Sequence, residues 1–348
     1  MSNHPLRIGI VGAGDNTRKR HIPGLRAIAD VEIVALCNRR PSSTEAVARN
    51  FSIPRTFARW EDLVADSEID AIVIGTWPYL HAPITMAALA AGKHVLCEAR
   101  MSMNVAEARE MLAASVQSPT LIAQLVPSPF GLKGDAVVRR LIGDEFLGEL
   151  REVQVVGMNG ALADPTAPLS WRQDAALSGV NMLTLGILHE TLIRWVPSPL
   201  RVLAQAHAFI SQRADPECGL RRTVGTPDSV QALTTLPNGG RGVYQFSGVV
   251  PVGGQMAIAL YGSDGMLRYD FIADRLYGTS RRDGELKEIP IPDHEAGGWR
   301  VEADFVDSIR NGTPVRLTEF ETGVRYMEFT EAVARSAQLG RAVELPLP

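Results

Sequence analysis

Short apolar runs alternate with segments of helical periodicity over the first 125 residues, and this alternation constrains the fold more than any other feature. The apolar runs predict five strands, at residues 7–11, 32–37, 71–75, 94–97 and 120–123. Between them, apolar residues recur at helical spacing in residues 18–29, 43–50, 82–91 and 105–116. Strands that alternate with helices form a parallel sheet with helices on both faces. This part of the chain is therefore predicted to be an α/β domain.

The remainder of the chain has a different pattern. Segments of alternating polarity predict strands at residues 151–156, 201–209, 229–236, 242–246 and 256–261. Helical periodicity marks residues 180–195, 298–310 and 319–339. We therefore expect an α+β domain with one large, mostly antiparallel open sheet. Because 348 residues exceed the ~250–300 residues that one core supports, two domains are predicted, at residues 1–124 and 125–348.

A glycine-rich loop follows the first predicted strand. It reads Gly12-Ala13-Gly14-Asp15-Asn16-Thr17, a G-x-G-x-x-G pattern in which Thr17 replaces the third glycine. The first glycine permits a tight turn, and the second lets a pyrophosphate approach the backbone at a helix N-terminus. At the start of a βαβ unit, this loop predicts a dinucleotide-binding Rossmann domain. The predicted cofactor-binding residues here are Gly12, Gly14, Asp15, Asn16 and Thr17. A tight strand–helix turn without a ligand is the alternative.

The end of the second predicted strand indicates which dinucleotide is bound. NAD sites place an Asp or Glu there to bind the ribose hydroxyls, whereas this chain has Asn38, followed by Arg39 and Arg40. The missing carboxylate removes repulsion against a 2′-phosphate, and a guanidinium binds such a group bidentately. Ser43 could donate a further hydrogen bond. NADP is therefore favoured and NAD remains open, while two arginines on a surface turn are the alternative.

Charge and composition exclude other partners. A formal net charge of −4 argues against a nucleic-acid partner. No apolar stretch approaches the ~20 residues of a membrane span, so no membrane partner is expected. Three scattered cysteines are too few for a disulfide framework or a zinc cluster, and no metal is predicted. Since no signal peptide precedes the first strand, a cytoplasmic location is expected.

Two segments of the first domain carry a family resemblance. Residues 90–100 read Ala-Ala-Gly-Lys-His-Val-Leu-Cys-Glu-Ala-Arg, which resembles the A-G-K-H-V-L-x-E-K-P segment of the Gfo/Idh/MocA family of nicotinamide-dependent sugar oxidoreductases. In that family the lysine serves in catalysis, but here Ala99 and Arg100 stand where lysine and proline are expected. Residues 76–81 resemble the family's T-P-x-x-x-H turn. The resemblance implies that Thr76, Trp77, Pro78, His81 and Glu98 lie beside the cofactor. For His81, capping of a turn is the alternative.

The resemblance extends into the second domain. Residues 170–172 and 178–189 resemble a family element that ends in D-x-G-x-H-x-x-D. The family's aspartate, histidine and final aspartate fall on Thr184, Leu188 and Thr191, so all three are lost. His189 comes one place late, which on a helix turns the side chain by about 100°. The predicted substrate-binding residues of this region are Trp171, Arg172, Asn181 and Glu190.

These departures leave few candidates for catalysis. The chain has only four lysines, and Lys133 is the one conceivable substitute for the family lysine, so a lysine-based mechanism is not expected. Oxidation of a hydroxyl needs a group that removes the proton and a charge that stabilises the oxyanion. The predicted catalytic residues are His189, Arg100 and Tyr79. His189 is the first choice because its unperturbed pKa lies nearest neutrality; a hydrogen-bonded helix histidine inside the domain interface is the alternative.

Together these features predict an NAD(P)-dependent oxidoreductase that acts on a carbohydrate or polyol by hydride transfer, with a non-standard acid–base set. One alternative is a nicotinamide-dependent glycoside hydrolase or lyase that works by transient sugar oxidation. Another is a catalytically silent protein that binds a nucleotide or sugar. The resemblance also implies association of the open sheets into a homodimer or homotetramer.

Overall fold

The structure is a computed structural model that describes residues 4–127 and 132–348. By internal contacts the chain forms two compact units, Met1–Pro127 with Arg300–Val324, and Ser128–Trp299 with Arg325–Pro348. The prediction divided the chain once, after Gln124. Residues 300–324 pack on the first sheet, where the Gln124 amide donates to the Val301 carbonyl at 3.2 Å. The first unit is therefore built from two separate stretches of the chain.

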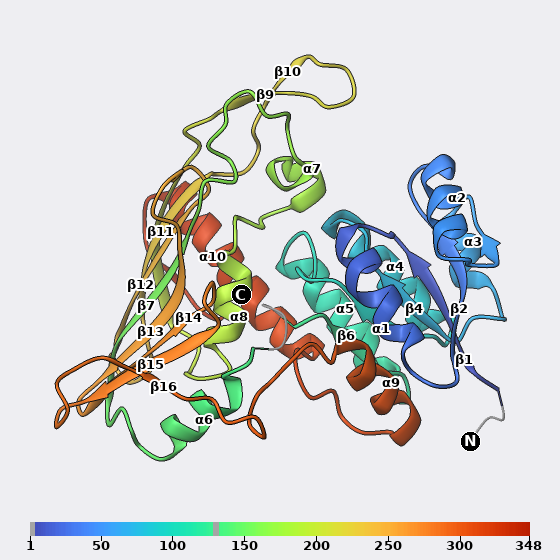
Figure 1. Ribbon diagram of the computed structural model, residues 1–348. Helices are drawn as coiled ribbons and strands as arrows, with labels where there is room; N and C mark the ends of the chain where they lie inside the picture. Colours follow the sequence, from blue (N-terminus) through green and yellow to red (C-terminus); the bar gives the residue numbers. More distant parts are fainter. Residues whose placement is uncertain (1–3, 128–131) are drawn as a thin grey trace. The chain divides into compact units, whose positions relative to one another are not determined.

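A six-stranded parallel sheet forms the centre of the first unit (Figure 1). Its strands are β1 (Leu6–Val11), β2 (Val31–Cys37), β3 (Arg55–Thr56), β4 (Ala71–Ile74), β5 (His94–Cys97) and β6 (Ala123–Leu125). The strand order is β3-β2-β1-β4-β5-β6, so the winding reverses between β1 and β4. Every residue of β4 is buried, as the apolar sequence predicts. Ligands of such sheets bind at this reversal, beyond the carboxyl ends of the strands.

Helices cover the sheet of the first unit. They are η1 (Thr17–His21), α1 (Ile22–Arg26), α2 (Pro41–Asn50), α3 (Trp60–Ala65), η2 (Pro78–Leu80), α4 (His81–Ala90), α5 (Val105–Gln117) and α9 (Val301–Asn311). The helix predicted at residues 18–29 begins as one π-helical turn, η1, before it becomes α1. The short elements β3 and α3 were not predicted. The predicted Rossmann fold is confirmed.

A nine-stranded sheet dominates the second unit, in the order β16-β15-β14-β13-β7-β12-β11-β8-β17. Its strands are β7 (Leu150–Met158), β8 (Arg201–His207), β11 (Ser229–Thr235), β12 (Arg241–Ser247), β13 (Gln255–Gly262), β14 (Gly265–Asp270), β15 (Arg275–Ser280), β16 (Lys287–Ile289) and β17 (Val343–Glu344). Only β7 and β12 pair in parallel among these described strands, so the predicted mostly antiparallel sheet is confirmed. A separate hairpin joins β9 (Gln212–Ala214) to β10 (Arg221–Thr223).

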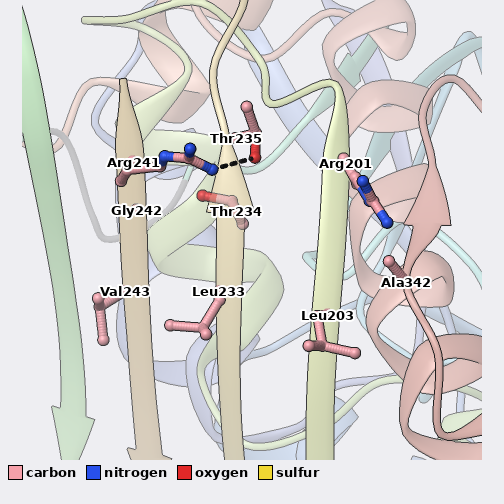
Figure 2. A pocket seen from close by; sticks show the side chains of 9 residues that line it. All are labelled: Arg201, Leu203, Leu233, Thr234, Thr235, Arg241, Gly242, Val243 and Ala342. Atoms are coloured by element: carbon pink, nitrogen blue, oxygen red, sulfur yellow. Dashed lines mark hydrogen bonds between the residues drawn. The ribbon is translucent and has the colours of Figure 1, made fainter. Parts of the chain in front are cut away.

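Helices cover one face of this large sheet. The helices of this unit are α6 (Asp135–Gly143), η3 (Trp171–Gln173), α7 (Ala175–Ser178), α8 (Leu185–Leu192) and α10 (Phe320–Leu339), of which α10 begins in the first unit. Those that contact the middle of the sheet are α8 and α10, which pack against β7 and β12. Ser336 of α10 accepts a hydrogen bond from the Ala204 amide of β8 at 2.9 Å. The other face leaves Leu203, Leu233 and Val243 between 43 and 55% exposed. These three side chains lie on neighbouring strands and line a shallow groove (Figure 2).

Candidate cofactor-binding site

The glycine-rich loop packs tightly against the end of β4. Gly12 has a φ of +88°, and a Cβ there would lie 2.6 Å from the Thr76 amide nitrogen. On the facing side, a Cβ at Gly75 would lie 2.2 Å from both the Gly12 carbonyl oxygen and Thr17 Oγ1. The Thr17 hydroxyl donates to that carbonyl at 3.1 Å. Thr17 therefore takes the place of the third glycine by a hydrogen bond, and Gly75 supplies the room that this requires.

A groove of about 650 Å³ opens at the carboxyl ends of β1, β2 and β4. Its lining includes these predicted cofactor residues: Gly12, Gly14, Asn38, Arg39, Arg40, Ser43, Thr76 and Trp77. Tyr79, predicted to be catalytic, also lines it. Other predicted cofactor residues lie outside the lining, namely Asp15, Asn16, Thr17, Pro78, His81 and Glu98. Sequence reasoning missed the wall formed by residues 58–61, because it follows a strand of only two residues.

Polar contacts shape the β2 end of the groove. Asn38 Oδ1 accepts from the Ala13 amide at 2.7 Å, and its Nδ2 donates to Ser43 Oγ at 3.1 Å. Asn38 thus joins the glycine loop to α2. The Arg39 guanidinium lies over the Trp77 ring, 5.2 Å from its centre, an arrangement typical of a cation–π contact.

The acidic residue of the glycine loop is neutralised locally. Asp15 pairs with Arg18 and Lys19, each at 2.7 Å. Hydrogen bonds from Lys19 and Arg18 lower the pKa of this exposed carboxyl. The loop therefore presents little net negative charge to an anionic ligand.

Four polar residues meet in a buried group that we call the His21 cluster: Asn16, His21, Glu98 and Glu302. His21 Nδ1 lies 2.5 Å from Glu302 Oε1, and His21 Nε2 lies 3.0 Å from Glu98 Oε1. Glu98 Oε1 also accepts from the Asn16 amide. Burial alone would lower the pKa of His21, but the bonds to Glu302 and Glu98 prevail and raise it to about 9. Burial opposes ionisation of Glu98, yet the bond from His21 holds its pKa below the usual value.

The His21 cluster predicts a stability that falls in alkaline solution. A histidine whose pKa rises from 6.5 to about 9 on folding stabilises the protein fully below pH 6.5 and ceases to do so as the pH passes 9. The contribution is roughly 3 kcal/mol, since each pKa unit equals ~1.4 kcal/mol. Thermal unfolding of wild type and His21→Gln should differ most at about pH 6 and converge at about pH 10. An equal difference at both pH values would contradict this assignment.

A second buried histidine joins two loops at the same edge. The ring nitrogens of His81 face the carbonyl oxygens of Arg100 at 2.8 Å and of Thr76 at 3.1 Å. Burial lowers the pKa of His81. Arg100 itself is 6% exposed. His81 thereby holds the loop after β4 against the loop after β5.

His189, the first choice for acid–base catalysis, lies inside the second unit with no exposed surface. Its Nδ1 is 3.0 Å from the Tyr244 hydroxyl, and its ring stacks on Phe329 at 3.7 Å. Burial lowers the pKa of His189 to about 3. The ring is therefore neutral and enclosed within the second unit.

The predicted substrate-binding residues also lie in the second unit. Glu190 forms a buried ion pair with Arg194 at 2.6 Å. Asn181 is buried and donates to the Ser178 carbonyl at 2.6 Å. The Arg172 guanidinium lies over the Trp171 ring at 4.3 Å. The side chains of Trp171 and Arg172 stack on one another, whereas Glu190 and Asn181 are buried and bind other residues of the second unit.

No three His, Cys, Asp or Glu side chains in residues 4–127 and 132–348 form a group that could hold a metal ion. No helix in this part of the chain has the length and apolar character needed to cross a membrane.

Comparison with known protein families identifies the family to which this chain belongs. Residues 6–123 match the model of an oxidoreductase family with an NAD-binding Rossmann fold, GFO_IDH_MocA, and residues 136–268 match the C-terminal domain of the same family. The chain belongs to the Gfo/Idh/MocA family. The predicted family and the predicted class, an NAD(P)-dependent oxidoreductase, are therefore confirmed.

Two named relatives and one solved structure are similar to this chain over most of its length. The chain is 29% identical to pig trans-1,2-dihydrobenzene-1,2-diol dehydrogenase, over 82% of this chain and 80% of that one. It is 23% identical to D-glucoside 3-dehydrogenase of Escherichia coli, over 99% of both chains. A solved structure of levoglucosan dehydrogenase with NADH and levoglucosan superposes with a TM-score of 0.85 at 20% identity, over 99% of this chain and 100% of that one. At that identity the structural likeness establishes the fold.

Proposed function

We propose that this Gfo/Idh/MocA protein is a dehydrogenase that binds NADP or NAD in the groove of the first unit and oxidises a hydroxyl of a carbohydrate or polyol. The groove at the carboxyl ends of β1, β2 and β4 carries the proposal. Relatives named for a D-glucoside, for levoglucosan and for a dihydrobenzene diol support the substrate class. All three names denote hydroxyl groups on a six-membered ring.

The residues of the groove fit a dinucleotide. Gly14 faces open space, since a Cβ there would lie no closer than 3.7 Å to another described atom. Thr76 Oγ1 is buried, lines the groove and has no hydrogen-bond partner among the described residues. Buried hydroxyls of this kind are usually satisfied, and a bound ligand would satisfy this one. When bound, the nicotinamide would supply the carbon that accepts the hydride.

The β2 end of the groove favours NADP. Asn38 uses its side-chain oxygen on the Ala13 amide, so it presents no carboxylate to a 2′-phosphate. Arg39 and Arg40 line the groove together with Ser43, and guanidinium groups bind phosphate strongly. Arg59, which the sequence interpretation did not include, lies in the wall of residues 58–61 and pairs with Glu61 of the same wall at 3.5 Å.

We expect the protein to bind NADPH more tightly than NADH, as measured by titration of cofactor fluorescence. Arg40→Ala should weaken NADPH binding about tenfold, the loss expected for one charge-assisted contact, and leave NADH binding nearly unchanged. Arg49→Ala, at the other end of α2 and outside the groove lining, is the matched control. Tighter binding of NADH than NADPH by the wild type would refute the 2′-phosphate assignment.

The residues that we propose for acid–base catalysis belong to the first unit rather than to the second. Of the predicted catalytic residues, Tyr79 lines the groove, and Arg100 follows β5 in the loop that His81 holds. We propose that Tyr79 takes part in proton removal and that Arg100 supplies fixed positive charge. The enclosure of His189 argues against direct proton exchange between that ring and a substrate.

The burial of His189 also favours a second candidate function, dinucleotide binding without turnover. Ala99, Thr184 and Leu188 stand where family members carry catalytic side chains, and His189 does not compensate. A panel of sugars and polyols assayed by nicotinamide absorbance separates the two functions. Turnover supports the dehydrogenase, whereas cofactor binding with no turnover on any panel member supports the silent protein.

Pairing of the open sheets through Leu203, Leu233 and Val243 into a homodimer or homotetramer is proposed for either function, and the cytoplasmic location stays a prediction.

A further inference from the structure

The His21 cluster joins parts of the first unit that are remote in sequence. His21 is the last residue of η1, Glu98 follows β5, and Glu302 lies in α9. Glu302 is 281 residues from His21 along the chain. His21 is fully buried, and the side chains of Glu98 and Glu302 are 15% and 3% exposed. Two carboxylates and an imidazole are thus enclosed with little access to water.

The geometry of the cluster fixes the charge of His21. An ionised carboxylate only accepts hydrogen bonds. Because Glu302 and Glu98 face the two ring nitrogens, both nitrogens must carry protons to satisfy both contacts. The ring is therefore an imidazolium, in agreement with its raised pKa. Glu98, which follows β5, and Glu302 of α9 face the ring, and His81 of α4 acts on Glu98.

Glu98 connects the two loops at the carboxyl edge of the sheet. One carboxylate oxygen accepts from Asn16 of the glycine loop and from His21, and the other accepts from the Ala99 amide at 3.2 Å. A dinucleotide spans the reversal of strand order, with its adenosine half beside the end of β2. Its other half then lies on the side of β4 and β5, where Glu98 is held.

We propose that His21 is a positioning residue for Glu98. His21, itself held by Glu302, fixes the Glu98 carboxylate between Asn16 and the Ala99 amide, and so sets the two loops that receive the nicotinamide half of the dinucleotide. None of the three side chains lines the groove, whose β2 end would receive the adenosine half. This inference rests on the proposed function, because it presupposes that the protein binds a dinucleotide.

The test compares a whole dinucleotide with its adenine half. Binding of ADP and of NADPH or NADH, whichever the wild type binds more tightly, is measured for wild type and His21→Gln. We expect the dissociation constant for the dinucleotide to rise about tenfold, a change typical of losing one charge-assisted contact, and that for ADP to change less than about twofold. No change for either ligand, or an equal rise for both, would overturn the proposal. If the wild type binds no dinucleotide, the proposed function itself fails.

A pH series provides the second readout and serves if His21→Gln does not fold. Dinucleotide affinity of the wild type should fall as His21 loses its proton in alkaline solution, while ADP affinity should not. Glu302→Gln removes one of the two carboxylates that hold the proton, so the same fall should occur at lower pH. Asp307→Asn, which changes an exposed carboxylate of the same helix α9, is the matched control and should leave the profile unchanged. Identical profiles for Glu302→Gln and wild type would overturn the proposal.

Discussion

Gly75→Ala is expected to abolish measurable dinucleotide binding and to destabilise the first unit. The new Cβ would lie 2.2 Å from the Gly12 carbonyl oxygen, which belongs to the backbone. That oxygen cannot move alone, because Gly12 has a φ of +88° and donates its own amide to the Cys37 carbonyl at 2.8 Å. Relief of the contact must displace the glycine loop from β4. We expect a loss of ~3 kcal/mol or more, at the upper end of overpacking effects.

Gly143→Ala is the matched control for this substitution. Gly143 ends α6 in the second unit, and a Cβ there would meet no described atom within 4 Å. Its replacement should leave the unfolding temperature unchanged or slightly raised, because alanine reduces the entropy of the unfolded chain. Thermal unfolding and cofactor titration measure both variants. Dinucleotide affinity of Gly75→Ala within threefold of the wild type, roughly 0.6 kcal/mol, would show that the loop does not need this close approach.

The importance of Gly75 illustrates what the sequence could and could not predict. The first sheet was predictable because each strand and helix has its own periodicity, and the pattern Gly12-Ala13-Gly14 follows directly on a strand. Gly75 was placed only as the end of a predicted strand. Its role depends on Thr17, whose hydroxyl occupies the space opposite. Such a contact between distant segments leaves no local signal in one sequence.

Contacts between residues far apart in the sequence explain where the other predictions differ from the structure. Glu302 lies in a predicted helix, and nothing near it indicates that His21 is its partner. His189 was chosen because its free pKa suits proton transfer, but burial beside Tyr244 and Phe329 changes that pKa. Family resemblance placed Glu98 and His81 near the cofactor edge; in the structure Glu98 follows β5 and His81 begins α4. Local pattern thus predicted elements and motifs, whereas tertiary burial and hydrogen bonding determined the ionisation of the histidines.

Arg213→Met is expected to cause a large loss of stability in the second unit. Arg213 of β9 is 1% exposed, and its guanidinium donates to the carbonyl oxygens of Leu162, Asp164 and Ala167 at 2.6, 2.7 and 3.0 Å. Methionine fills much of the same volume but leaves these oxygens without their donor. At about 1 kcal/mol for each of these partly buried hydrogen bonds, we expect a loss of ~3 kcal/mol in the free energy of unfolding.

Substitution of a surface arginine in the neighbouring strand is the control that distinguishes loss of the carbonyl contacts of Arg213 from loss of a positive charge. Arg222 of β10 pairs with Asp174 and Asp215, yet its side chain is 46% exposed, so water takes the place of its guanidinium beside the two carboxylates when it is removed. Arg222→Met should therefore lower the unfolding temperature far less than Arg213→Met. Neither variant should change dinucleotide affinity, because both residues lie in the second unit and outside the groove lining. Equal losses in the two variants would mean that the three carbonyl contacts of Arg213 add nothing beyond its charge, and that the segment before Trp171 is held in place by other interactions.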